Sequence, residues 1–176
     1  MLEVIFGVVA GVAFFLLIAT IYSNRFHLVI MKIDKAEEDI DMYLIKKKEL
    51  LDRTRPIVMK EVKLEEFIPE IGIDFDTINN FEENEILKKA YNELLRIIDE
   101  NDKLLKSDAL TAILDSLNEN EENIVGAIRF YNDTVVEFNH LILSFPSNII
   151  AFFKRYHKKE FYKNEKREMY EILSEK

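Results

Sequence analysis

An apolar pattern with a helical heptad period constrains this chain more than any other feature. Along residues 110–145 its members follow one another in steps of four and three, and only Glu121 among them is polar. Held over this many turns, the period predicts one long helix packed along its whole length against neighbours, with left-handed bundle geometry. We expect Pro146 to end the helix, and Phe145 to be the last residue of the packed face. The positions are Leu110, Leu114, Leu117, Glu121, Ile124, Ile128, Tyr131, Val135, Phe138, Ile142 and Phe145.

The N-terminal segment carries a second strong pattern, an uncharged apolar run over residues 4–21. At a helical rise of about 1.5 Å this run spans roughly 27 Å, close to the hydrocarbon thickness of a bilayer. The residues before it include Glu3 but no Lys or Arg, and the cleavage pattern after it is poor. We therefore interpret it as an uncleaved signal-anchor in contact with the lipid bilayer. Gly7 and Gly11 have the GxxxG spacing of helix-pairing faces, which leaves a homo-oligomer open.

The charges that flank the apolar run predict its orientation. No Lys or Arg precedes the run, whereas Arg25, Lys32 and Lys35 follow it. Because positively charged flanks stay on the cytoplasmic side, we expect a single-pass protein whose large C-terminal part is cytoplasmic.

Few breaks interrupt the rest of the chain, which has only 4 Gly and 3 Pro and is therefore expected to form few, long elements. Between residues 28 and 51 apolar residues recur at helical spacing, so we expect the membrane helix to continue as a first bundle helix to about Arg53. Pro56 predicts a break or kink, followed by a short helix over residues 57–67 and a connection over residues 69–80. The apolar positions of the first helix are Ile33, Ala36, Ile40, Leu44 and Leu51.

Another helix is predicted over residues 82–105, with one face made by Leu87, Tyr91, Leu94, Ile98, Asn101 and Leu105. Ser107 and Asp108 are typical of the start of the next helix. A short apolar helix over residues 148–156 and a charged tail complete the chain. The predicted fold is all-α, with an N-terminal transmembrane helix (anchor, residues 1–24) continuing into an antiparallel bundle of about four helices (residues 25–176, charged tail included).

An aromatic-Asn pair recurs once per heptad in the longest helix, first as Tyr131 and Asn132 and then as Phe138 and Asn139. The two aromatic residues belong to the packed face, and the two Asn residues lie at its edge. One interpretation is that each amide bonds a facing helix and fixes its register, because a buried partner left empty costs about 1–3 kcal/mol. The other is that both Asn side chains are half-exposed and inert.

An arginine, two aromatic-Asn pairs, a Phe-Pro pair and an alanine follow one another in residues 129–151. This order, preceded by an acidic-Asn-Ile segment at residues 122–124, resembles the C-terminal signature of the LemA family of membrane-anchored bacterial proteins. Residues 39–51 are similar to the family's N-terminal segment, although this chain has no Trp and the family's proline is displaced to Pro56. The resemblance implies an antiparallel helical bundle on the bacterial inner membrane and no established activity. The signature residues are Arg129, Tyr131, Asn132, Phe138, Asn139, Ile142, Phe145, Pro146 and Ala151.

The sequence offers little catalytic or metal chemistry. Glu137 and His140 have the Glu-x-x-His spacing of di-iron bundles, but a second such pair is missing. The heptad pattern also directs both side chains outward. Without cysteine, a phosphate-binding glycine loop or a nucleophile elbow, we expect no enzyme, cofactor or metal. A net charge of -9 argues against a nucleic-acid partner.

The remaining charges are interpreted mainly as solvated helix faces. The three lysines at residues 46–48 are expected on the exposed side of the first helix, with a docking patch as the alternative. The tail, basic and interleaved with aromatic residues (Phe152, Phe153, Tyr156, Phe161 and Tyr162), is a candidate contact for a partner or the membrane surface.

The sequence therefore predicts a single-pass, membrane-tethered scaffold or interaction module whose partners are other membrane or envelope proteins. The alternative is a metal-binding or enzymatic bundle with a site inside it, which inward-facing carboxylate and His side chains would reveal.

Overall fold

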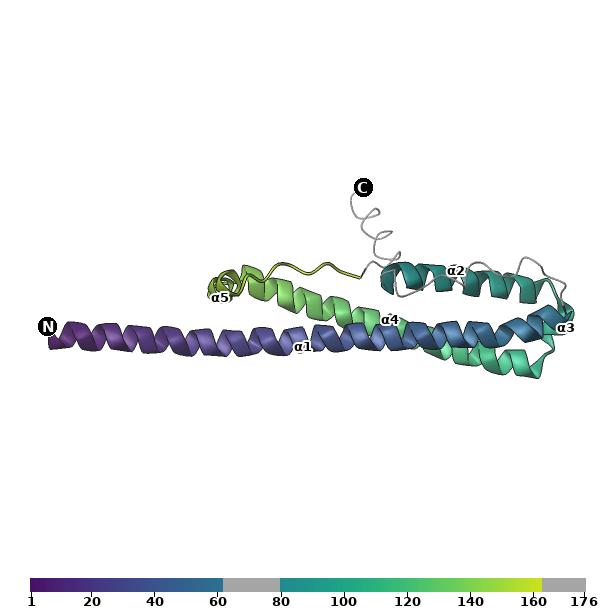
Figure 1. The fold of residues 1–176 in the computed structure, drawn as a ribbon, viewed down its shortest axis with the longest axis horizontal. Coiled ribbons are helices and arrows are strands. Elements are labelled where there is room, and N and C mark those ends of the chain that lie inside the picture. Colours follow the sequence, from purple (N-terminus) through teal and green to yellow (C-terminus); the bar gives the residue numbers. More distant parts are fainter. Residues whose placement is uncertain (62–79, 163–176) are drawn as a thin grey trace, which may run out of the picture. The chain divides into compact units, whose positions relative to one another are not determined.

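The computed structural model describes residues 1–61 and 80–162, and these residues form helices without any strand (Figure 1). The helices are α1 (Leu2–Glu61), α2 (Asn80–Asp99), α3 (Asp102–Leu105), α4 (Asp108–Leu143) and α5 (Ser147–Lys154). The all-α prediction, with a long apolar N-terminal helix followed by further helices, is confirmed. Most of the predicted helix at residues 57–67, the connection at 69–80 and the end of the charged tail lie outside the described residues.

The chain divides into two compact units, and α1 and α4 each contribute to both. Unit 1 combines Met1–Ala36 with Arg129–Tyr162, and unit 2 contains Glu37–Ile128. The predicted boundary at residue 24 separates an anchor from a bundle domain by their expected position in the bilayer. The two compact units are defined by packing and do not test that boundary, so it stays a prediction.

The buried face of α1 is an unbroken seam in steps of three and four. All five apolar positions predicted for the first helix are buried, and the seam extends beyond them in both directions. Two polar residues, Lys47 and Thr54, belong to it and are fully buried. The seam consists of Phe26, Val29, Ile33, Ala36, Ile40, Leu44, Lys47, Leu51, Thr54 and Val58.

The predicted break at Pro56 is wrong, because α1 continues through this proline to Glu61. A proline inside a helix removes one backbone hydrogen bond and costs about 3 kcal/mol. Pro56 lies on the exposed side of α1, while Val58, two residues further, is fully buried in the seam. Packing of the seam beyond the proline therefore offsets the local cost.

The helix predicted over residues 82–105 is divided in two. Asn101 has an extended backbone, and its side-chain amide donates to the Ile97 carbonyl at 3.1 Å, which satisfies a carbonyl at the end of α2. As a result Leu104 is buried in α3, whereas the predicted Leu105 is exposed.

The predicted start of α4 is confirmed, because the Leu110 N–H donates to the Ser107 hydroxyl at 3.4 Å, as at a helix N-cap.

The core of unit 1 is an aromatic cluster at the end of the apolar run of α1. The Phe26 ring lies 5.9 Å from the Phe138 ring of α4 and 5.0 Å from the Tyr156 ring. Ala19 and Tyr22 also pack against this cluster. The other buried members are Val29, Ile33, Val135, Leu141, Ile150 and Ala151.

Most of the apolar run before this cluster has no packing partner within the described chain. In the described residues, α1 is the one helix that is by itself long and apolar enough to cross a membrane, and none of its apolar window is buried. The α4–α5 pair passes the same test only when the two helices are taken together, and they are bent by 95°. The apolar run of α1 is therefore the candidate membrane span.

Replacing Pro56 with Ala tests the continuity of α1. Restoring the backbone hydrogen bond and the better helix former should raise the free energy of unfolding by about 1–3 kcal/mol, because the helical φ and ψ angles are already in place. Chemical denaturation of the full chain in detergent measures the effect. The matched control is Met59→Ala, an exposed change in the same helix, which should stay within about 0.5 kcal/mol of the parent. A loss of stability in Pro56→Ala contradicts the explanation given for this proline.

Candidate functional site

The two Asn residues of the heptad repeat each hold one backbone residue of the segment that follows α5. The Asn132 amide donates to the Tyr162 carbonyl at 3.0 Å, and the Tyr162 N–H donates to Asn132 Oδ1 at 2.7 Å. Asn139 makes the same pair of bonds with Lys159, both at 2.9 Å. Asn132 and Asn139 are called the Asn clamps below, because each amide satisfies both a donor and an acceptor of the main chain.

The heptad spacing of the Asn clamps matches the geometry of an extended partner. Seven residues of α-helix rise about 10.5 Å, and three residues of extended chain cover about 10 Å. Lys159 and Tyr162 are three residues apart, so an extended segment running antiparallel to α4 presents one backbone residue to each amide. Figure 1 shows this segment returning beside α4.

The register interpretation is therefore right about bonding and wrong about the partner, which is an extended segment and not a facing helix. From the sequence, residues 159–162 were interpreted as part of a charged tail. The seven-residue spacing of Asn132 and Asn139 was the one sequence feature that indicated an extended partner.

The aromatic signature residues of α4 take different places. Phe138 is almost fully buried in the unit 1 core, as expected. Tyr131 is half-buried, and its hydroxyl donates to the Glu160 carbonyl at 3.2 Å, next to the Asn clamps. Phe145 was expected to be the last packed residue, but it is 81% exposed because α4 ends at Leu143 and the chain turns away.

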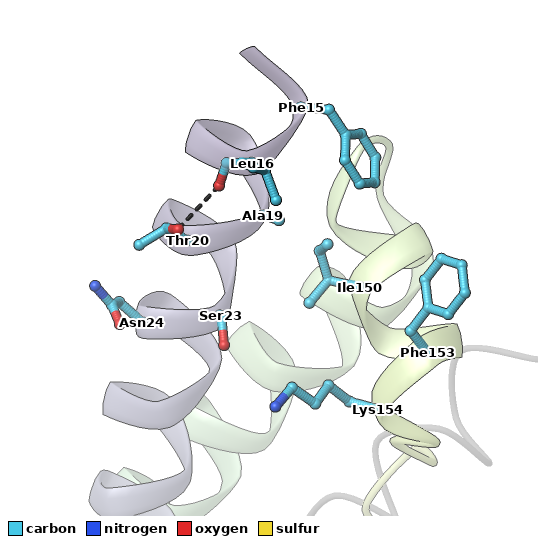
Figure 2. Close-up of a pocket in the computed structure, with 9 residues that line it drawn as sticks. All are labelled: Phe15, Leu16, Ala19, Thr20, Ser23, Asn24, Ile150, Phe153 and Lys154. Carbon is cyan, nitrogen blue, oxygen red and sulfur yellow. Dashed lines mark hydrogen bonds between the residues drawn. The ribbon is translucent and has the colours of Figure 1, made fainter. Parts of the chain in front are cut away.

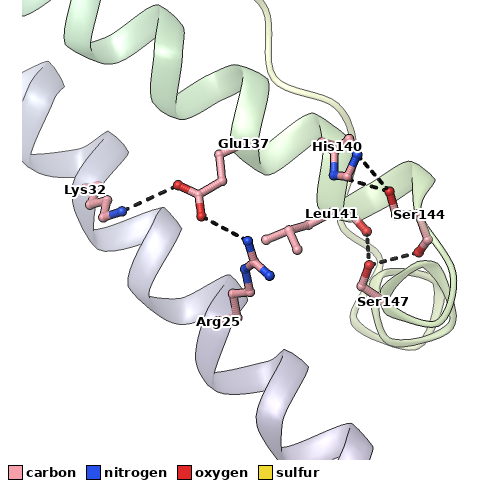
Figure 3. A network of polar contacts seen from close by, with 7 residues as sticks. All are labelled: Arg25, Lys32, Glu137, His140, Leu141, Ser144 and Ser147. Carbon is pink, nitrogen blue, oxygen red and sulfur yellow. Dashed lines mark hydrogen bonds and ion pairs between the residues drawn. The ribbon is translucent and has the colours of Figure 1, made fainter.

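The turn between α4 and α5 depends on Ser147, for which no role was predicted from the sequence. Pro146 precedes α5 through a cis peptide bond with Phe145. The buried hydroxyl of Ser147 lies 2.7 Å from the Leu141 carbonyl and 2.8 Å from the Ser144 carbonyl (Figure 3). These carbonyls lie at the end of α4, where helical donors run out, so Ser147 replaces a missing donor. A serine after the Phe-Pro pair was the available signal.

The end of α5 directs the chain back toward α4. Arg155 has a left-handed backbone, with a φ of 55°. The Tyr156 N–H donates to the Ala151 carbonyl at 2.9 Å, and the Arg155 N–H donates to the Phe152 carbonyl at 3.1 Å. These are the bonds of a Schellman turn, in which the residue after the turn often makes an apolar contact with the helix. Here that residue, Tyr156, packs into the unit 1 core beside Ala151.

Glu137 was expected to point to the outer surface, but it lies at the edge of α4 next to α1 and its side chain is only 35% exposed. Its carboxylate faces α1 and forms ion pairs with Arg25 at 3.6 Å and Lys32 at 3.4 Å (Figure 3). His140, three residues further, is exposed, and both of its ring nitrogens lie near the Ser144 hydroxyl. Glu137 therefore serves an ion pair with α1, and His140 contacts a residue at the end of α4. The two side chains do not converge as metal ligands.

Unit 2 contains a buried charged residue, Lys47, which was predicted from the sequence to lie on the surface. Lys47 was expected on the exposed side of α1, but its side chain is fully buried and forms an ion pair with Glu121 of α4, whose side chain is 30% exposed. The Lys47 amino group also lies 5.9 Å from the centre of the Tyr91 ring of α2. Burial lowers the pKa of Lys47 from its usual value, and the bond to Glu121 partly opposes that shift.

Further polar contacts surround this pair and connect three helices of unit 2. The fully buried Asn120 donates to the Tyr43 carbonyl at 2.9 Å, one turn before Lys47. The Tyr91 hydroxyl donates to Asn118 Oδ1 at 2.6 Å. Burial, followed by the charge of Glu121, raises the pKa of Tyr91. In the sequence, the one polar residue among the heptad positions of α4 was Glu121. This exception indicated a polar contact between packed helices.

Neither polar site has the composition of a metal centre. In the part of the chain that the structure describes, no three or more His, Asp or Glu side chains are grouped so that they can hold a metal ion. The expectation of a protein without metal or cofactor stays a prediction.

Replacing Asn139 with Ala tests the Asn clamps. The change strands one donor and one acceptor of Lys159, so the free energy of unfolding should fall by about 1–3 kcal/mol. The Lys159 amide should also exchange its hydrogen faster. Asn139→Asp is the matched variant, because it keeps an acceptor for the Lys159 N–H but has no donor for the carbonyl. Hydrogen exchange and denaturation of the full chain in detergent report both effects, and unchanged exchange at Lys159 in Asn139→Ala contradicts the assignment.

Replacing Glu121 with Leu tests the buried pair. Because this leaves Lys47 buried without its ion-pair partner, we expect a loss of about 3 kcal/mol in the free energy of unfolding. The double variant Lys47→Met with Glu121→Leu should recover most of that loss, since an apolar pair of similar size often replaces a buried ion pair without cost. Chemical denaturation measures both, with the exposed change Glu122→Leu as control. Equal losses in the single and double variants would contradict the explanation that the unpaired Lys47 charge causes the loss.

Comparison with known families gives a match that includes the Asn clamps and part of the polar site around Lys47. The model of the LemA family matches residues 73–172, which is more than half of the chain. This range contains the Asn clamps, the segment that they hold, and the α2 and α4 residues around Lys47. A comparison with curated proteins finds no match. The length of the family match, together with an apolar N-terminal helix and a described structure of helices without strands, shows that this chain belongs to the LemA family.

Proposed function

We propose that this protein is a single-pass membrane tether that carries a helical interaction module on the cytoplasmic side of the bacterial inner membrane. One observation carries the proposal: a single helix changes from fully exposed apolar surface to buried core without a break. Phe6 and Leu17 are 69% and 63% exposed, whereas Phe26, further along α1, is fully buried. Exposed apolar surface of this length is stable in lipid and costly in water. The anchor and the core of unit 1 are therefore parts of one helix with no linker between them.

The polar groups support an interaction module over the alternative of an internal reactive site. The Asn clamps hold main-chain groups, and Lys47 pairs with Glu121, so these polar groups are engaged within the chain. A reactive site needs groups directed at a substrate, with a cavity to hold it. Partners of a tether in the membrane are other membrane or envelope proteins, or a second copy. For a second copy, Gly7 and Gly11 offer an open face, because among the described residues a Cβ on either glycine meets nothing within 4 Å beyond its own helix backbone.

Orientation and anchoring are tested with single cysteines, which the chain allows because it has none of its own. In intact cells a membrane-impermeant maleimide should label Leu2→Cys, whereas Asp115→Cys should react only after lysis. Exchanging Arg25, Lys32 and Lys35 for Gln and adding lysines before residue 4 should reverse the pattern. Labelling of Asp115→Cys in intact cells contradicts the orientation, and release of the chain from membranes by alkaline carbonate contradicts the anchor.

The interaction role is tested by crosslinking in native membranes. Photocrosslinkers at exposed positions of the helical units should give discrete protein adducts. A matched chain with the same crosslinker in the anchor alone identifies background from lipid and neighbouring spans. Adducts to lipid alone at every position would contradict the interaction module, and stoichiometric metal in the purified chain would favour the alternative.

A further inference from the structure

The short helix α5 exposes large aromatic side chains although it lies beside the core of unit 1. Ile150 and Ala151 face inward and belong to that core, whereas Phe152 and Phe153 are 79% and 72% exposed. Phe145, just before α5, is exposed as well. A cluster of exposed aromatic residues on a small unit indicates a contact surface, since single exposed apolar residues are common and clusters are not.

A groove joins α5 to the end of the apolar run of α1. Its volume is about 400 Å³, and Figure 2 shows α1 on one side and α5 on the other. The residues from α1 are Phe15, Leu16, Ala19, Thr20, Ser23 and Asn24, and those from α5 are Ile150, Phe153 and Lys154.

The depth of α5 in the membrane follows from this groove, given the anchor of the proposed function. If residues 4–21 fill the hydrocarbon layer, Phe15 lies about 9 Å below its edge and Asn24 about 4.5 Å above it, at 1.5 Å per residue. Because both residues line the groove that α5 closes, α5 lies at the boundary between hydrocarbon and headgroups.

The direction and charge of α5 suit that depth. In unit 1, α4 packs along α1, and α5 is bent by 95° from α4. It therefore crosses the direction of the anchor and lies close to the plane of the bilayer. Lys154 and Arg155 follow the two aromatic residues, and basic residues beside exposed aromatics are typical of helices that bind anionic membrane surfaces.

We propose that α5 is a second membrane contact, which inserts Phe152 and Phe153 among the headgroups and upper acyl chains of the leaflet from which the anchor emerges. Lys154 and Arg155 then face the lipid phosphates. The surface continues the lipid-facing surface of the anchor through Phe15 and Phe153, which line the same groove. This continuity favours lipid over a separate protein as the occupant.

Single tryptophans test the proposal, because the chain has none. Three full-length variants are reconstituted in vesicles of phosphatidylcholine and phosphatidylglycerol: Phe6→Trp in the anchor, Phe153→Trp in α5 and Phe130→Trp on the exposed side of α4. Lipids brominated at a shallow or a deep acyl position then quench the fluorescence according to depth. In Phe153→Trp we expect a blue-shifted emission that shallow bromines quench more than deep ones. In Phe130→Trp neither should quench.

The Phe6→Trp variant separates failure of this proposal from failure of the anchor. If Phe6→Trp is quenched and Phe153→Trp emits like a tryptophan in water, the anchor stands, α5 is free for a protein partner, and the proposal is overturned. Stronger quenching of Phe153→Trp by deep bromines overturns it too, because α5 would then be part of a second span. Absence of quenching in Phe6→Trp contradicts the proposed anchor itself.

Lys154→Glu in the Phe153→Trp background tests the phosphate contact. It should reduce shallow quenching in vesicles that contain phosphatidylglycerol and have less effect in phosphatidylcholine alone, since the attraction depends on anionic lipid. Equal quenching with Lys and Glu in both vesicles would refute the role of this charge.

Discussion

Burial along one face of α1 is the constraint on which the rest of the structure depends. Each fully buried Leu, Ile or Phe contributes about 1.5–3 kcal/mol relative to its exposed state, and the seam contains many such residues. That sum exceeds the local cost of Pro56, so the helix does not break there. It also accommodates Lys47, whose charge is tolerated because Glu121 lies opposite. The same face begins just after the apolar run, so one periodic pattern determines where the exposed apolar surface of α1 ends and its buried face begins.

The Asn clamps solve a different problem, which is how to hold an irregular segment that has no hydrogen-bond ladder of its own. Residues after Tyr156 lie against α4 with little buried apolar surface to fix them, apart from contacts such as the Tyr131–Tyr162 ring pair at 6.3 Å. Side-chain amides supply the missing main-chain bonds at two points. Together with the turn at Arg155, they hold the C-terminal part of the described chain against α4 in unit 1.

Much of this fold could be predicted from the sequence, because it follows from periodicity. The seam positions of α1 and most of those of α4 are buried as the pattern required, and Ser107 starts α4 as its side chain suggested. The candidate membrane span followed from composition alone. These features depend on local chemistry repeated many times, so no single exception changes the result.

The missed features depend on contacts between residues far apart in the chain. Pro56 and Phe145 were misjudged because local rules end a helix at proline, whereas packing carried α1 through one proline and α4 stopped before the other. Lys47 looked like one of three solvated lysines, and only its place opposite Glu121 explains its burial. The partner of the Asn clamps is formed by residues 20 and 30 positions further along the chain, in a segment without any repeating pattern.

The Asn clamps bind main-chain atoms, which has a consequence for how this region can change over time. Substitutions other than proline at positions 159 and 162 leave the bonded N–H and C=O groups in place, so the amide bonds themselves do not depend on which side chains stand there. Adding or deleting a residue between these two positions shifts the backbone by about 3.4 Å, and the second amide then meets the wrong group. The length of the segment between the two clamped residues should therefore vary less among related proteins than its composition.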